Sequence, residues 1–251
     1  MALIKDIYNF LTDFAPLELQ MSFDNSGFLV GRKENAVSKV LLALDITLPV
    51  IEEAEKLGAQ LIVSHHPLIF HPLKSITDDK FLSIVKSDIS AICMHTNLDI
   101  CDGGVNDVLI ETLTGNKAML KLGDDNCGRV AELEKGMKLS DFLALCKEKL
   151  NCAGIRFYDA DRVVKRVACV GGAGADYMEL AFEAGCDTFV SADIKYHEFQ
   201  RAAELGINLI DADHFCTENP VIPVLHKKLS AAFPDVSFSV SQQHGQIISF
   251  Y

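Results

Sequence analysis

One order of strand, helix and strand occurs twice in this chain, and the two copies align without a gap. Residues 40–70 contain a strand pattern, a helical pattern that stops at Gly58 and a second strand pattern; residues 167–197 repeat this order with a stop at Gly185. The aligned identities pair Val40 with Val167, Glu52 with Glu179, Ala54 with Ala181, Gly58 with Gly185, Val63 with Val190 and Ser64 with Ser191. Strands that alternate with helices are typical of α/β folds, in which helices cover both faces of a sheet. We therefore expect two similar three-layer α/β lobes related by internal duplication, over 1–124 and 125–251, although each lobe need not be continuous in sequence.

Three short motifs rich in histidine and carboxylate each follow an apolar run that is typical of a buried strand. They are Ser-His-His-Pro at 64–67, His-Thr-Asn-Leu-Asp at 95–99 and His-Phe-Cys-Thr-Glu at 214–218. In the last two, a carboxylate follows a histidine at the same spacing, which extends the internal repeat. Because ligand sites in α/β folds form where strands end, these motifs predict a metal site between the two lobes. The predicted ligands are His65, His66, Asp99, His214 and Glu218.

This ligand set is larger than one catalytic zinc ion needs, because such an ion usually takes three protein ligands. It suits two divalent ions about 3.5–4 Å apart that share a carboxylate. Zn, Mn, Fe, Co and Ni all accept imidazole and carboxylate ligands, so the residue types do not choose among these metals. On a regular strand His65 and His66 would point to opposite faces, but Pro67 takes the chain out of regular pairing. Both imidazoles can then face one cavity.

Other residues near these motifs are compatible with more than one role. His95 could be a ligand, a group that orients a ligand, or a proton carrier. We expect His95 and His197 to be the catalytic residues. Asp193 and His197 could orient the ligands or act as acid and base groups that face the metals, or they could be a helix cap and a surface histidine. The glycine-rich stretch 171–174 could hold a phosphate on its backbone N–H groups, or it could simply allow a tight turn.

Composition argues against several classes of protein. A net charge of −12 makes nucleic-acid binding through a broad basic face unfavourable. Eight cysteines without a Cys-x-x-Cys pair favour small buried thiols in a reducing cytoplasm over disulfides or thiolate zinc sites. Residues 1–14 have the pattern of an amphipathic helix rather than a signal peptide, and no apolar run approaches the ~18 residues that cross a bilayer. We expect a cytoplasmic protein that does not enter a membrane.

Six segments together resemble one known family. They are FDNSGFLVG at 23–31, SHHPLIF at 64–70, HTNLD at 95–99, GGVND at 103–107, DIKYH at 193–197 and DADHFCTE at 211–218. The family is the Nif-three-like family (NGG-one-interacting factor three), whose members are often labelled GTP cyclohydrolase I type 2 homologues. The motifs cover nearly the whole chain in the family's order, and the length resembles the short form without an inserted domain.

This resemblance implies two similar α/β lobes with a dinuclear metal site between them. The family's ligand positions fall on the residues already selected by spacing, which are His65, His66, Asp99, His214 and Glu218. The resemblance also implies a homo-oligomer, a toroidal hexamer whose sites face an inner cavity.

The chain departs from the family pattern at three positions. Phe23 stands where the family usually has tryptophan, which changes local packing. Ala192 and Asp213 each replace a usual glycine, and Asp213 directly precedes His214. The additional carboxylate could change the metal preference or the hydrogen bonds around the ligands.

The sequence favours a metal-dependent hydrolase, in which a pair of cations activates water for attack on a carbon or phosphorus atom. The resemblance implies a nucleotide such as GTP or a similar small molecule, but no segment indicates a pocket that reads a base. The alternative is a non-enzymatic protein: one that handles or inserts metal, or a ring that binds a partner. Turnover by the metal-loaded protein would separate these two hypotheses.

Overall fold

The computed structural model describes residues 1–251, and the chain divides into two compact units. The first unit comprises Met1–Cys101 and Ile222–Gly245, and the second comprises Asp102–Val221 and Gln246–Tyr251. The chain thus leaves the first unit and returns to it near the C-terminus. The boundary expected between residues 124 and 125 remains a prediction, because compactness does not by itself show which segments fold independently.

The sheet of the first unit has five strands in the order β1-β4-β3-β2-β11. The strands are β1 (Gly27–Val30), β2 (Lys39–Ala43), β3 (Leu61–Ser64), β4 (Ser90–Cys93) and β11 (Ser237–Val240). β11, β2, β3 and β4 are parallel neighbours, and β1 runs antiparallel to β4. β3 and β4 are buried along their whole length. Strands buried on both faces read as continuous apolar runs, which is how they appear in the sequence.

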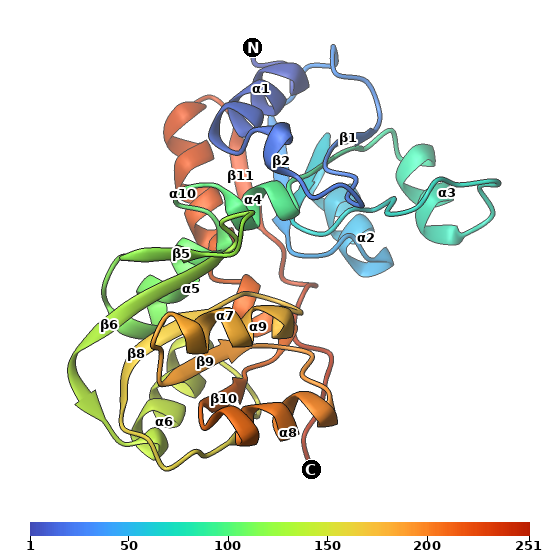
Figure 1. The fold of residues 1–251 in the computed structure, drawn as a ribbon. Helices are drawn as coiled ribbons and strands as arrows, with labels where there is room; N and C mark the ends of the chain where they lie inside the picture. Colours follow the sequence, from blue (N-terminus) through green and yellow to red (C-terminus); the bar gives the residue numbers. More distant parts are fainter. The chain divides into compact units, whose positions relative to one another are not determined.

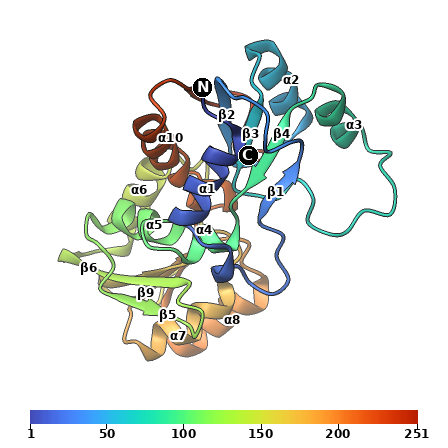
Figure 2. The same ribbon diagram turned by 90° about the horizontal axis from the view of Figure 1, so that it is seen from above.

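Helices cover both faces of this first sheet. They are α1 (Ile4–Phe14), α2 (Leu48–Leu57), α3 (Asp79–Lys86), α4 (Thr96–Ile100) and α10 (Val221–Ala232), with a 3-10 turn η1 (Leu17–Leu19). α2 and α3 lie on one face of the sheet, and α1 and α10 lie on the other (Figures 1 and 2). In α1 the regularly spaced Ile4, Ile7 and Leu11 are all buried. Their burial explains why the N-terminal segment forms an amphipathic helix.

The sheet of the second unit has six strands in the order β5-β6-β8-β9-β10-β7. The strands are β5 (Leu120–Leu122), β6 (Gly128–Met137), β7 (Arg156–Tyr158), β8 (Val164–Cys169), β9 (Thr188–Ser191) and β10 (Asn208–Asp211). β8, β9 and β10 are parallel neighbours. The outer strands pair antiparallel to them, β6 with β8 and β7 with β10.

Helices also cover both faces of the second sheet. They are α5 (Val105–Thr114), α6 (Leu139–Lys149), α7 (Met178–Glu183), α8 (Tyr196–Leu205) and α9 (His214–Glu218), with a 3-10 turn η2 (Ala175–Tyr177). α5 and α6 pack on one face in a core that includes Leu109, Phe142 and Val167. α7 and α8 lie on the opposite face (Figures 1 and 2).

Each unit is therefore a three-layer α/β lobe, which confirms the fold class expected from the alternation of strands and helices. The repeated segment corresponds to β2-α2-β3 in the first unit and to β8-α7-β9 in the second, and the two strands of each copy are parallel neighbours. The glycine after each helix adopts a left-handed conformation, with φ of 66° at Gly58 and 76° at Gly185. The internal duplication remains a prediction that these similarities support.

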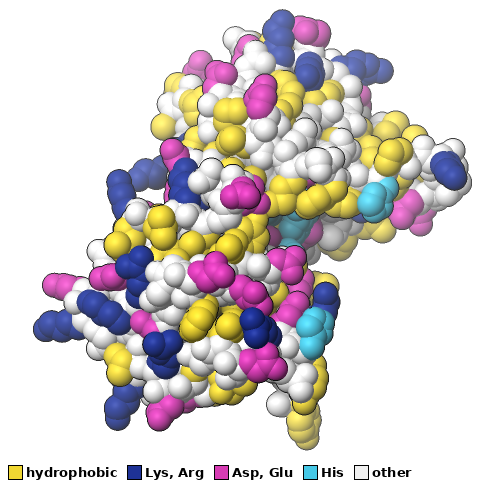
Figure 3. Space-filling model, viewed as in Figure 1, with side chains coloured by type: hydrophobic (Ala, Val, Ile, Leu, Met, Phe, Trp, Pro, Cys, Tyr) yellow, Lys and Arg dark blue, Asp and Glu magenta, His cyan; other side chains and the backbone are white.

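Charges of both signs lie on the surface, and the cysteine thiols are buried. On the face drawn in Figure 3, acidic and basic side chains are interspersed. The eight cysteines are buried free thiols, and burial raises the pKa of the Cys186 thiol to about 11. Thiols with raised pKa values are poor nucleophiles and poor metal ligands at neutral pH. None of the helices combines the length and hydrophobicity that crossing a bilayer requires.

Candidate metal centre

A first group of metal-type side chains lies at the carboxyl ends of β3 and β4. Its members are His65, His66, His95 and Asp99. Because β3 and β4 are parallel neighbours, the residues that follow them emerge at one edge of the sheet. One ring nitrogen from each of the three histidines lies within 4.8 Å of the other two. This first ligand group therefore presents three imidazole nitrogens to one small volume.

His65 is fully buried, and its tautomer follows from its hydrogen bond. Its Nδ1 lies 2.8 Å from the carbonyl oxygen of Met94. Because a carbonyl oxygen only accepts hydrogen bonds, Nδ1 carries the proton and donates, and Nε2 of a neutral ring keeps a lone pair. That Nε2 lies 3.5 Å from Oδ1 of Asp99. The burial and the hydrogen bond together fix the direction in which Nε2 points.

His66 is oriented by a carboxylate on the neighbouring strand connection. Its Nδ1 lies 2.8 Å from Oδ1 of Asp45, which follows β2. The rings of His65 and His66 are 4.9 Å apart between centroids, so these adjacent histidines do not diverge as they would on a regular strand. The break in strand geometry before Pro67 makes this possible. A carboxylate behind a ligand histidine fixes its ring and raises the basicity of the free nitrogen.

His95 is held by Asp24 in the same manner. The Nδ1 of His95 lies 2.7 Å from Oδ1 of Asp24, and the side chain of Asp24 is fully buried. The carboxylate also accepts hydrogen bonds from the backbone N–H and the hydroxyl of Thr96. Burial alone would raise the pKa of Asp24, but the hydrogen bonds from His95 and Thr96 outweigh it and hold this pKa well below its usual range. Asp24 is therefore an ionised group that holds the ring of His95 in place.

Asp99 reaches the first ligand group through a short helix. It lies in α4, which begins directly after His95, and its backbone N–H donates to the carbonyl oxygen of His95. His95 is the N-cap of α4, with a non-helical ψ of −111°. The spacing observed in the sequence is therefore realised as a histidine at the start of α4 and a carboxylate one turn into it.

A second group lies in the second unit, at the end of β10. The helix α9 carries His214 at its first position and Glu218 at its last, with 3.2 Å between Nε2 of His214 and Oε1 of Glu218. Nδ1 of His214 lies 2.8 Å from Oδ2 of Asp193. Glu218 is buried. This second ligand group therefore repeats the pattern of the first, in which an acceptor holds Nδ1 and a carboxylate faces Nε2.

Gly172 lies so close to the second ligand group that a larger residue there would displace a ligand side chain. A Cβ atom at this position would approach Oε1 of Glu218 far inside 3.0 Å and would lie 3.0 Å from Nε2 of His214. Its φ of 63° is also left-handed, a region that glycine adopts without strain. Its backbone N–H donates to Oγ1 of Thr217 at 3.0 Å. The backbone therefore forms one wall of the second ligand group.

The glycine-rich stretch 171–174 is thus better explained as a close approach of backbone to side chains than as a phosphate loop. The N–H of Gly171 donates to Oδ1 of Asn106 at 2.7 Å, and the N–H of Gly174 donates to Oγ of Ser191 at 2.9 Å. With Gly172 also bonded to Thr217, these N–H groups already have acceptors within the protein. Of the two interpretations left open by the sequence, the tight turn is the one that the structure favours.

Asp213 precedes His214 and has a structural role. It adopts a φ of 68°, and its Oδ1 accepts a hydrogen bond from the backbone N–H of Cys216 at 3.1 Å. Its ψ of 138° places this backbone outside the left-handed helical region, in a conformation that strongly favours glycine, while aspartate is a favoured N-cap. The departure from a usual glycine therefore adds a cap to α9 together with backbone strain.

The donors in both groups fit a divalent transition-metal ion. Imidazole nitrogen and carboxylate oxygen are ligands that such ions accept readily. In each group a ring nitrogen that keeps its lone pair faces a carboxylate oxygen, at 3.5 Å for His65 and 3.2 Å for His214. A carboxylate oxygen this close to Nε2 is stabilised by a proton on the ring or by a metal ion bound to both atoms. These histidine and carboxylate groups could therefore hold a metal ion.

Comparison with known proteins identifies the family. The model of the Duf34/NIF3 (NGG1p interacting factor 3) family matches residues 2–246. The chain belongs to this family. The resemblance noted from its motifs is thereby confirmed, and the family match covers both ligand groups.

Individual members of the Duf34/NIF3 family match along nearly the whole chain. A protein of Clostridium perfringens named GTP cyclohydrolase 1 type 2 homolog is 38% identical over 252 residues, which is 96% of each chain. A protein of Clostridium acetobutylicum with the same name is 36% identical over 91% of this chain and 90% of its own. The crystal structure of hypothetical protein SA1388 from Staphylococcus aureus aligns with a TM-score of 0.91 at 30% identity, covering 99% of both chains.

His197 was predicted as a second catalytic residue, and its surroundings differ from those of the ligand histidines. It lies in α8 with a side chain that is 72% exposed, and its Nε2 is 3.9 Å from Oε1 of Glu198 on the same helix. A surface histidine of this kind is compatible with the alternative interpretation given to it from the sequence. A catalytic role for His197 remains a prediction.

Of the three aspartates that hold histidines, the sequence indicated only Asp193. Asp24 and Asp45 were not selected, and Asp193 was selected with two possible roles. Asp24 precedes an Asn-Ser-Gly turn, so its carboxylate could have been assigned to the turn alone. Asp45 follows an apolar strand pattern, as the histidine motifs do. This position was the one sequence signal that could have placed Asp45 near the ligands.

Proposed function

We propose that this protein is a metal-dependent hydrolase whose two ligand groups together bind two divalent ions. The proposed ligands are His65, His66, Asp99, His214 and Glu218. The observation that carries this proposal is the repeated arrangement of the imidazoles, each with Nδ1 held by an acceptor. Such an arrangement directs Nε2 outward as a ligand atom and is typical of metal-binding histidines.

The residues around the ligands have separable tasks in the proposed reaction. Two bound divalent ions would supply Lewis acidity and activated water near neutral pH. Asp45 and Asp193 would hold the rings of His66 and His214 in place. His95, paired with the ionised Asp24, would accept a proton from water and return it to the leaving group. His197 is the second candidate for proton transfer.

The proposed substrate is a nucleotide or a similar small molecule. The name GTP cyclohydrolase 1 type 2 homolog, carried by the clostridial relatives, motivates this choice. We further propose a cytoplasmic protein that assembles into a toroidal homohexamer. The net charge of −12 favours a small-molecule substrate over nucleic acid.

A second candidate function is the transfer of metal to another protein. One observation favours it: the carboxylates of Asp45 and Asp193 are about half exposed, although they hold ligand histidines. Water can compete for such carboxylates, so the rings they hold could turn and release an ion more easily than buried ligands would. Rapid exchange of metal without turnover would support this second function.

The test combines metal content with turnover. Protein purified without added metal and then reconstituted with Mn, Zn or Fe should contain about two ions per chain by elemental analysis, as expected for a dinuclear centre. It should hydrolyse GTP or another phosphorylated compound in a broad panel. His66→Ala should lower both metal content and turnover, whereas His71→Ala, which removes an exposed histidine nearby, should leave the metal content unchanged. A metal content near zero after reconstitution would refute both functions, and bound metal without turnover would refute the hydrolase.

A further inference from the structure

Two phenylalanines are exposed beside the first ligand group. Phe23 is 60% exposed and Phe70 is 37% exposed. They come from segments far apart in the chain, yet their ring centroids are 6.3 Å apart, with an angle of 45° between the rings. Aromatic side chains contribute most when buried, so this exposed pair has contact area that a ligand could cover.

Both phenylalanines are connected to His95. The ring of Phe70 is 6.1 Å from the ring of His95, at an angle of 81°. Phe23 precedes Asp24, whose carboxylate accepts the hydrogen bond from Nδ1 of His95. The same loop is joined to the segment before Phe70, because Nδ2 of Asn25 donates to the carbonyl oxygen of Ile69 at 2.6 Å. The backbone segments that carry the two phenylalanines are thus joined to each other by a hydrogen bond beside His95.

We propose that Phe23 and Phe70 form an aromatic subsite that stacks against a planar heteroaromatic ring of the substrate. The inference rests on the proposed function, since the ring belongs to the molecule that the metal centre hydrolyses. Every nucleobase offers a flat π-face, and stacking on an aromatic side chain is a large and sequence-tolerant contribution to binding. The subsite would therefore select substrates that carry a flat ring, and it would do so without hydrogen bonds to the edge of that ring.

A small ring fits this surface better than a second copy of the chain does. A stable protein interface buries about 800 Å² on each partner, whereas the aromatic pair is only two side chains. The pair also borders the ionised Asp24, whose carboxylate accepts hydrogen bonds from His95 and Thr96. Aromatic side chains beside a few fixed polar groups are common in small-molecule sites.

The sequence provides a direct probe, because the chain contains no tryptophan. In Phe23→Trp the single indole reports on this position alone, and the family resemblance indicates that tryptophan is tolerated there. Titration with GMP should quench its fluorescence, while ribose 5-phosphate, which lacks the base, should not. Adding Phe70→Ala should raise the Kd for GMP about 5- to 150-fold, the range expected when one stacking partner is removed.

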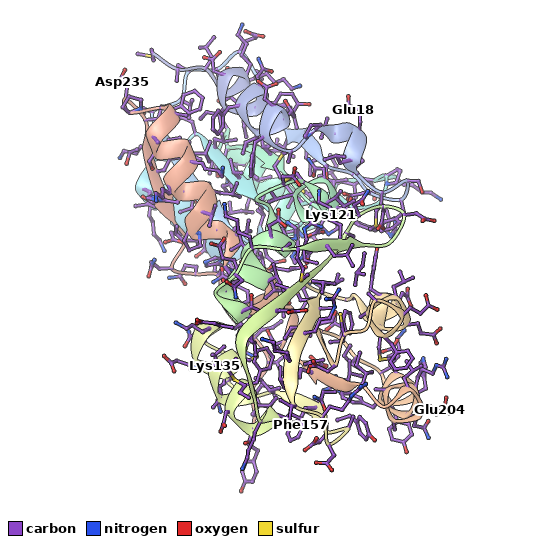
Figure 4. The ribbon with its side chains drawn as sticks, turned by 60° about the vertical axis from the view of Figure 1, so that its left-hand side comes forward. Glu18, Lys121, Lys135, Phe157, Glu204 and Asp235 are labelled. Atoms are coloured by element: carbon purple, nitrogen blue, oxygen red, sulfur yellow. The ribbon has the colours of Figure 1, made fainter.

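The control is Phe157→Trp on β7 in the second unit. Phe157 is 51% exposed, similar to Phe23, and is labelled in Figure 4. GMP should leave the fluorescence of this variant unchanged. Equal quenching of both variants, or equal binding of GMP and ribose 5-phosphate, would overturn the proposal. The proposal would also be overturned if the fluorescence of Phe23→Trp changed with protein concentration but not with GMP. The aromatic pair would then contact a second copy of the chain.

Binding and hydrolysis can fail separately. Calorimetric titration of the wild-type protein and of Phe70→Leu with GMP gives a measurement that does not depend on the tryptophan. If the hydrolase proposal fails, the metal-loaded protein shows no turnover while GMP still quenches Phe23→Trp. If the subsite proposal fails, turnover persists and Phe23→Ala with Phe70→Ala leaves KM unchanged for a base-containing substrate. In the supporting case the double variant raises KM and leaves metal content as in the wild type.

Discussion

Replacing Gly172 by alanine should weaken metal binding more than it weakens the fold. Two costs arise at this position. Alanine in the left-handed region, at a φ of 63°, costs about 1–2 kcal/mol. The new Cβ would also approach Oε1 of Glu218 far inside normal contact distance, so this carboxylate must move away from His214. Functional groups must be held within about 0.5 Å of their productive positions. A displaced ligand should therefore lower metal affinity by about 10- to 100-fold or more.

A matched control separates the two costs. Gly185 also has a left-handed φ, 76°, but a Cβ there would meet nothing within 4 Å. Gly185→Ala therefore carries the backbone strain without the collision. For a chain of this size, 1–2 kcal/mol lowers Tm by roughly 2–8 °C. Both variants should show this loss when measured without metal.

The assay is metal retention after dialysis against a graded series of chelator concentrations, with elemental analysis of the protein. Gly185→Ala should retain metal as the wild type does, and Gly172→Ala should lose it at lower chelator concentration. If the two variants retain metal equally, the proximity of Gly172 to Glu218 does not control the ligand geometry. That result would refute the reasoning, whatever the change in Tm.

Three further predictions concern buried charges and the anchors of the ligand histidines. The pKa of Asp24 is lower in the folded protein than in the unfolded chain. Its carboxylate therefore contributes its full stability above the unfolded pKa of about 4. This contribution is lost as the pH falls from there through the lower pKa of the folded state. Asp24→Asn should therefore cost about 2–3 kcal/mol at neutral pH and flatten the acid limb of a stability–pH profile obtained by urea unfolding. Arg129 is fully buried and paired with Asp107, so Arg129→Met should lower the free energy of unfolding by about 3–5 kcal/mol. Arg166→Met breaks a more exposed pair and should lower it by under about 1 kcal/mol. Equal losses in the two variants would contradict this prediction. Asp193→Asn should lower metal affinity about 10- to 100-fold with little change in stability in the absence of metal, which chelator competition and thermal unfolding would measure.

The sequence was sufficient for the fold class because the signals involved are local. Buried parallel strands appear as apolar runs, and the segments between them show helical spacing. The candidate ligands could be selected for the same reason, since each follows a strand directly, and the spacing of His95 and Asp99 is a helical turn. Whether those residues come together in space depends on contacts between distant segments. Their convergence could therefore only be proposed from the sequence.

The anchors of the histidines illustrate what could not be predicted. The bond between His66 and Asp45 depends on β2 lying beside β3 in the sheet, and the carbonyl oxygen that orients His65 belongs to the end of β4. Backbone acceptors leave no signal in the sequence, because every residue has one. The close approach of Gly172 to the second ligand group was equally hidden, since a glycine-rich turn and a phosphate loop require the same residues.

The proposed duplication gains a physical interpretation from the aligned positions of the two copies. In the gapless alignment, His66 falls opposite Asp193, and Asp45 falls opposite Gly172. In the first unit, the aspartate after β2 holds the histidine after β3. In the second unit, the position of that histidine is an aspartate, which holds His214 from the next strand end. The position of the anchoring aspartate is a glycine, whose missing side chain leaves space for Glu218. One ancestral unit could thus have given rise to two different ligand groups through two changes. The ligand histidine became an aspartate that orients another histidine, and the orienting aspartate became a glycine that leaves room for a ligand carboxylate. Gly172→Asp tests this reading, since restoring the carboxylate should displace Glu218 and reduce metal retention below that of Gly172→Ala.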